Sequence, residues 1–149
     1  MASIYNQQDA ESYIARINLL TPISQHIWGS MTVAQMLAHI QQPIRVALGE
    51  FKAKRTIIGI LFGGIAKKGL INEKPFKQGL PTANSFVIEN DRNFNYEKAK
   101  AIELIQKLTA VGPSGVTKDK HPIFGKLSAE EWDVLTVKHL DHHLRQFGV

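Results

Sequence analysis

The sequence predicts an all-α fold, a four-helix bundle with a long connection between its second and third main helices. Four segments repeat apolar residues with the period of an amphipathic helix, and two of them begin with a capping box. Strand signals are poor, and the long stretch between the second and third segments contains glycines and prolines without a sustained helical period. Helices with such connections pack most economically as a bundle.

The first two helices are expected over residues 10–20 and 33–50. Pro22 closes the first, because proline cannot continue a helix. The second follows Thr32, whose hydroxyl can cap the helix while Gln35 reaches back to complete a capping box. This second helix is apolar over most of its circumference, which predicts deep burial.

The last two helices are expected over residues 96–110 and 129–147. Asn95 is the expected cap of the first of these. Ser128 and Glu131 form a capping box for the other, which ends before a glycine.

The long stretch at residues 51–95 is expected to cover the bundle or to serve as a functional loop. Within it, residues 57–67 could form a short helix that packs as a cover, and residues 70–90 have local strand character compatible with a small hairpin. The apolar run at residues 57–66 is too short to span a bilayer.

Composition indicates one domain over residues 1–149, large enough to bury a core without a disulfide or a structural metal. The chain has no cysteine, which excludes thiolate ligands and cysteine nucleophiles. The N-terminus does not resemble a signal peptide, so we expect a cytoplasmic protein with no membrane partner. The net charge of +5 slightly favours anionic ligands.

Two histidines near the C-terminus have the spacing of a metal site. His139 and His143 lie four residues apart on the last helix, so their side chains can converge on one ion. On a helical wheel they share a stripe with Trp132 and Leu135, which we expect in the core, while His142 lies at the edge of that stripe. Buried neutral imidazoles need partners for both ring nitrogens, and a divalent metal provides one.

A third ligand should come from a facing helix, and the candidates are His39, His26 and His121. We favour His39, because it alone lies in a strongly apolar helix, although each of the three could instead be an ordinary core or loop residue. Three histidines that leave coordination positions open are typical of catalytic rather than structural zinc sites. Imidazole ligands suit zinc, nickel and ferrous iron, so the sequence does not choose among these divalent metals.

Several segments, spread over most of the chain, carry a resemblance to a known family. They are Trp28-Gly29-Ser30-Met31-Thr32, Gln35-Met36-Leu37-Ala38-His39, Leu80-Pro81-Thr82, Ser85-Phe86, His121-Pro122-Ile123-Phe124-Gly125, Glu131-Trp132 and the tail from His139 to Gly148. The chain resembles the DinB-like superfamily of metal-dependent four-helix-bundle proteins, and within it a branch known mainly as a domain of unknown function. The resemblance implies that His39, His139 and His143 hold the metal. It also implies the transfer of low-molecular-weight thiols or the isomerisation of small substrates, although many relatives have no known activity.

The sequence therefore favours a metal-dependent enzyme that transfers or isomerises a small molecule, either anionic or carrying a thiol. Gln146, His142 and His121 are the expected further contacts to a ligand ring or a substrate, and no catalytic residue is assigned, because no general base is evident near the histidines. A non-catalytic binding module on the same bundle is one alternative, and a homodimer is left open.

A nucleic-acid binder is the weaker alternative. It would use a basic cluster around the long connection, which has almost no aromatic residues between its charges for base stacking. The cluster consists of Lys52, Lys54, Arg55, Lys67, Lys68, Lys74 and Lys77.

Overall fold

The computed structural model describes residues 2–72 and 74–149, and over these residues the chain is all-helical, with five α-helices, two short 3₁₀ helices and no strand. The α-helices are α1 (Gln7–Leu19), α2 (Val33–Ala47), α3 (Ile57–Ile71), α4 (Phe94–Val111) and α5 (Ala129–Gln146). The 3₁₀ helices are η1 (Asn84–Phe86) and η2 (Pro113–Gly115). The expected all-α class is confirmed, and no hairpin forms in the described part of residues 70–90.

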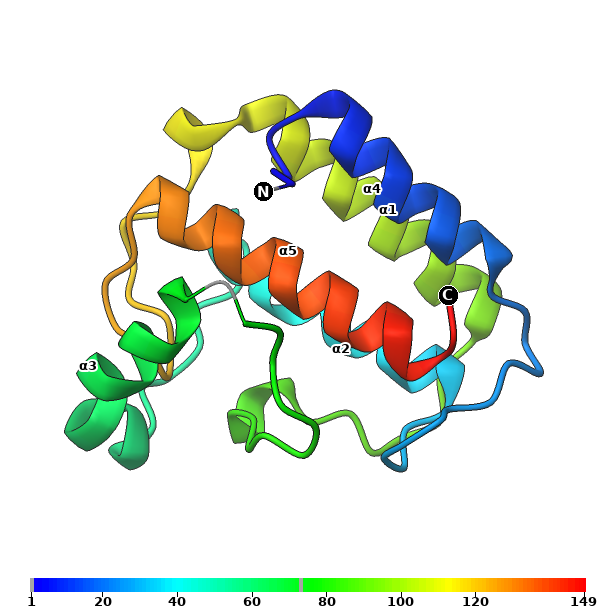
Figure 1. Cartoon of the computed structure of the whole chain (residues 1–149), viewed down its shortest axis with the longest axis horizontal. Coiled ribbons are helices and arrows are strands. Elements are labelled where there is room, and N and C mark those ends of the chain that lie inside the picture. Colours follow the sequence, from blue (N-terminus) through cyan, green and yellow to red (C-terminus); the bar gives the residue numbers. More distant parts are fainter. Residues whose placement is uncertain (1, 73) are drawn as a thin grey trace.

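Helices α1, α2, α4 and α5 pack around a common apolar core (Figure 1). Both α2 and α1 contact α4 on one side and α5 on the other. Ile17, Ile40 and Ile105 are at most 1% exposed, each from a different one of these helices. Trp132 and Leu135 of α5 are buried as expected, at 1% and 3% exposure. The inward face of α5 therefore follows from its apolar period.

Both capping boxes form. Thr32 accepts the backbone N–H of Gln35, whose side-chain oxygen accepts the N–H of Thr32 in return. Ser128 and Glu131 make the same reciprocal pair at the start of α5. Each pair satisfies two backbone donors that a helix N-terminus would otherwise leave unpaired.

Two helices begin earlier than the sequence predicted. Helix α1 follows Asn6, whose side chain accepts the N–H of Asp9 at 3.1 Å. Helix α4 follows Asn93, which accepts the N–H of Tyr96 at 2.9 Å, so Asn95 lies in the first turn and is not the cap. The apolar period defines which face is buried, but it does not tell which polar residue precedes the first turn.

Helix α3 is the main departure from the expected four helices. It extends beyond residues 57–67 to Ile71 and lies at one edge of the molecule, where it contacts α5 (Figure 1). Of its described side chains, Leu70 reaches the common core. The expected helix forms, but most of its apolar side chains face solvent and do not cover the bundle. No helix in residues 2–72 and 74–149 is long and apolar enough to cross a membrane.

Candidate metal centre

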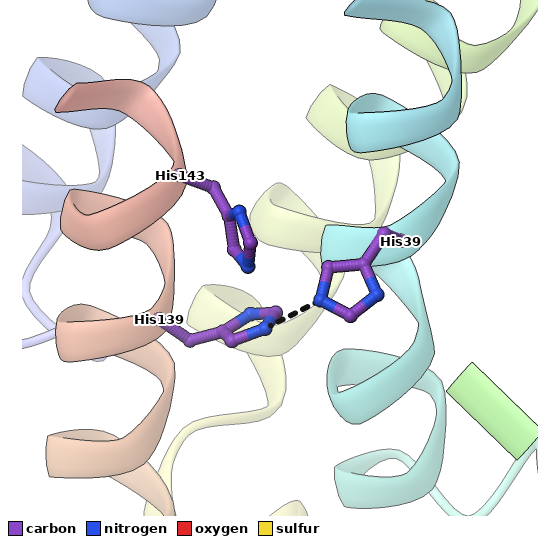
Figure 2. Close-up of side chains that lie close together, drawn as sticks. All are labelled: His39, His139 and His143. Carbon is purple, nitrogen blue, oxygen red and sulfur yellow. Dashed lines mark hydrogen bonds between the residues drawn. The ribbon is translucent and has the colours of Figure 1, made fainter. Parts of the chain in front are cut away.

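Three histidine rings meet where α2 packs beside α5. His39 comes from the middle of α2, and His139 and His143 come from successive turns of α5, with all three rings turned toward one another (Figure 2). The Nε2 atoms of His39 and His139 are 3.0 Å apart, and one nitrogen of each ring lies within 4.8 Å of the others. His39 and His143 are buried, and His139 is partly buried.

This spacing suits a single divalent ion. Zinc binds imidazole nitrogen at about 2.0 to 2.1 Å, so tetrahedral geometry places two ligand nitrogens roughly 3.3 Å apart. The separation of His39 and His139 is already close to that value, and the nitrogen of His143, which lies within 4.8 Å of both, would have to move closer. The three side chains could therefore hold one metal ion and leave other coordination positions open to a ligand.

Hydrogen bonds orient two of the three rings with Nε2 toward the cluster. Nδ1 of His39 lies 2.9 Å from the carbonyl oxygen of Phe86, and Nδ1 of His143 lies 2.8 Å from Oε1 of Gln146. Because these oxygens can only accept, each Nδ1 carries the hydrogen and each Nε2 presents its lone pair. Metal-ligating histidines commonly have such partners, which set the tautomer and hold the ring in place.

Gln146 is itself fixed by the segment that precedes α2. Its Nε2 donates to the carbonyl oxygen of Trp28 at 2.8 Å. Gly29 has a φ of +84°, and a Cβ at this position would lie 2.5 Å from the same Nε2. A glycine is needed here both for the backbone conformation and for this close approach.

The electrostatics of the cluster favour neutral imidazoles. Burial lowers the pKa of His39, and burial together with the nearby His39 lowers the pKa of His143 to about 3. The pKa of His139 lies well below its usual range, first because of burial and then because of the two other rings. All three are therefore neutral near pH 7 and can bind a metal ion without net release of a proton. Without an ion, Nε2 of His139 donates to Nε2 of His39 at 3.0 Å, so His139 would have to move its hydrogen to Nδ1 to bind metal through Nε2.

The histidines lie at the wall of a cavity of about 620 Å³. Apolar side chains form much of it, including Met31, Phe86, Ile123 and Leu135. Among the described residues that line it, Glu89 is the one carboxylate, and it is exposed to solvent. The cavity is thus large enough for a small molecule and offers it few charged groups.

The other candidate histidines lie outside the cluster. His121 is buried and lines the cavity, and its Nδ1 accepts the backbone N–H groups of Ile123 and Phe124. His142 also lines the cavity. His26 is exposed, with Nδ1 3.1 Å from the carbonyl oxygen of Met31.

Two contributions to the site had no signal in the sequence. The Phe86 carbonyl that orients His39 belongs to the backbone of η1, and although Ser85-Phe86 contributes to the family resemblance, nothing in it indicates a contact to His39. Glu89 reaches the cavity because the chain after η1 follows its rim. Glu131 caps its helix and pairs with Lys67 at 2.8 Å.

Comparison with known families and structures gives one match. A family model described as a protein of unknown function (DUF1569) matches residues 5–148, so the chain belongs to this family. No curated protein and no solved structure matches the chain.

We predict that acid destabilises the metal-free protein partly through His121. Burial lowers the pKa of His121 to about 3, against roughly 6.5 in an unfolded chain, so at pH 5 only the unfolded state binds this proton. The contribution of His121 to the free energy of unfolding is fully present above about pH 6.5. It decreases below that pH, by about 2 kcal/mol at pH 5. Denaturant unfolding at pH 7 and pH 5, with a chelator present, measures the loss.

In His121→Gln the loss between pH 7 and pH 5 should be smaller by about that amount, because glutamine does not titrate. His26→Gln, at an exposed position, is the matched control and should lose as much as the wild type. An equal pH dependence in His121→Gln and the wild type would contradict the prediction.

Proposed function

We propose that this member of the DUF1569 family is a divalent-metal protein that transfers or isomerises a small molecule at the three-histidine centre. The observation that carries the proposal is the convergence of His39, His139 and His143 beside a cavity, with two of the rings oriented through Nδ1. When bound, a divalent ion with neutral ligands keeps its full charge and can lower the pKa of a water toward about 7 or bind a substrate thiolate.

We further propose that the fold is a DinB-like four-helix bundle in a single domain, with α1, α2, α4 and α5 as the bundle and α3 within the long connection. The resemblance to the DinB-like superfamily implies one metal ligand on the second bundle helix and two on the last. His39 on α2 and the pair His139 and His143 on α5 have this arrangement.

The chain's own residues act mainly by binding and orienting. The cavity wall, with side chains such as Met31, Phe86 and Leu135, would contact the apolar part of a substrate and exclude water around it. The anionic group of the substrate, such as a thiolate, would face the three histidines. Gln146 would keep the ring of His143 in position throughout.

A non-catalytic binding module is the second candidate function. One observation favours it: Glu89 is the one carboxylate among the described cavity residues, and it is solvent-exposed. A substrate that needs a proton removed would have to bring its own acidic group, such as a thiol, whose proton a metal can displace. A protein that only retains a ligand needs no such group.

We predict that His143→Ala abolishes metal binding or weakens it greatly while the chain stays folded. The variant removes one of three ligands, and a core of this size does not need the ion to fold. Equilibrium dialysis with zinc or nickel, beside circular dichroism, measures both effects, with His26→Ala as the control. Full metal stoichiometry in His143→Ala would show that His143 is not a ligand, and an unfolded variant would show that the site is structural.

Gln146→Ala should weaken metal binding by about 10- to 100-fold without removing a ligand, because His143 loses the acceptor that orients it. Competition with a chromogenic chelator gives the dissociation constant. Gln25→Ala, at an exposed position, is the matched control. Unchanged affinity in Gln146→Ala would mean that the hydrogen bond to His143 does not support the site.

Thiol transfer tests the proposed activity. Metal-loaded protein is incubated with glutathione and chlorodinitrobenzene, so that a carbon–sulfur bond forms as chloride leaves, and the absorbance of the thioether is followed. We expect a rate above background with metal and the background rate for His143→Ala. If this and a wider panel of thiols and electrophiles give no turnover while metal binds, the binding module is the better account.

A further inference from the structure

Helix α3 exposes an apolar face that the metal centre does not use. Six large apolar side chains in the first nine residues of α3 are between 55% and 76% exposed, whereas Leu70 near its end is buried. They are Ile57, Ile58, Ile60, Leu61, Phe62 and Ile65. Ile57, Leu61 and Ile65 follow one another at intervals of four residues, so they form one stripe along the outer side of the helix.

The attachment of α3 to the rest of the molecule keeps these side chains outside. Gly59 and Gly63 lie on the opposite side of the helix, where a Cβ would come within 2.4 Å of the Pro122 carbonyl oxygen and 2.6 Å of the Ile123 carbonyl oxygen. The glycines thus let the helix approach this backbone closely. The large residues take no part in that contact.

Hydrogen bonds hold both ends of α3. At its start, Thr56 accepts the N–H of Gly59 at 2.9 Å and donates its own N–H to the Pro122 carbonyl oxygen at 3.1 Å. At its end, Nζ of Lys138 donates to the carbonyl oxygens of Leu70 and Asn72 at 2.9 and 3.0 Å. The helix therefore has a defined position that does not depend on burial of its apolar stripe.

The charged residues in the segment that contains this stripe are all basic, and one of them, Lys67, pairs with Glu131 of α5. From residue 51 to residue 72 the sequence contains lysine and arginine but no aspartate or glutamate. Lys52 and Lys54 are exposed just before the helix, and Lys68 is exposed on the same side as Leu61. Among the described residues, no carboxylate pairs with these three lysines.

An exposed aliphatic stripe with lysines near both ends combines the two attractions that hold a protein at a membrane surface, namely burial of apolar area and attraction to anionic lipids. We propose that α3 binds the surface of a bilayer that contains anionic lipids. Ile57, Leu61 and Ile65 enter the boundary of the acyl chains, and Lys54 and Lys68 contact the lipid phosphates. The expectation of no membrane partner rested on the lack of a signal peptide and of a run long enough to span a bilayer, and a helix lying along the surface requires neither.

A second copy of the chain suits this face less well, because apposing two copies would bring their basic residues together without acidic partners. Nucleic acid also suits it less well, because base stacking needs aromatic rings, and Phe62 is the one aromatic residue of α3.

Flotation with vesicles tests the proposal on the full chain. Vesicles of phosphatidylcholine with phosphatidylserine should carry the protein to the top of a density gradient, and vesicles of phosphatidylcholine alone should carry much less. Raised salt should weaken binding to the anionic vesicles, since it screens the lysines. Binding to neither kind of vesicle would overturn the proposal.

The double variant Leu61→Ser/Ile65→Ser should lower the vesicle partition coefficient at least about tenfold, because two apolar side chains no longer enter the bilayer. Leu19→Ser/Ile23→Ser, at exposed apolar positions outside α3, is the matched control and should bind as the wild type does. Circular dichroism should give the same spectrum for all three proteins, because none of these side chains is in the core.

Light scattering after size exclusion tests whether a second copy of the chain, rather than a bilayer, covers the apolar face of α3. A dimer that Leu61→Ser/Ile65→Ser converts to a monomer, together with unchanged vesicle binding, would assign the face to a second copy and overturn the proposal. A monomeric wild type supports it. His143→Ala should still bind vesicles, so failure of the metal proposal would not affect this result.

Discussion

The need to satisfy buried imidazoles is the constraint on which the site depends. Each neutral ring has one nitrogen that donates and one that accepts, and a buried group without a partner costs about 1 to 3 kcal/mol. The Nδ1 atoms of His39 and His143 donate to oxygens, and Nε2 of His39 accepts a hydrogen bond from Nε2 of His139 at 3.0 Å. Their Nε2 atoms point at the shared space between α2 and α5, where a metal ion can bind all three histidines at once.

The segments between the helices complete the arrangement. The chain before α2 provides the Trp28 carbonyl that holds Gln146, and η1 provides the Phe86 carbonyl that holds His39. The same segments line the cavity, so the groups that orient the ligands also enclose the space for a substrate. Helix packing therefore sets the distance between the histidines, and the irregular segments set their orientation.

The long connection between α2 and α4 has two structurally different halves. Its second half, from Phe76 to Glu89, lines the cavity, while its first half forms α3 with an exposed apolar face. Ile123 joins the two, because it lines the cavity and its carbonyl oxygen meets Gly63 of α3. A surface that binds anionic lipid would thus lie beside the site that binds a small molecule.

The sequence by itself determined the all-α class, both capping boxes and the inward stripe that carries His139 and His143, because these depend on spacings of three and four residues within one helix. The strongly apolar sequence of α2 also favoured His39 over His26 and His121 as the third ligand, and His39 is buried. Only the tertiary structure decided that the Phe86 carbonyl reaches His39 and that α3 faces outward. The physical reason is that such contacts join residues far apart along the chain, and they depend on the path of irregular segments, for which no local spacing rule exists.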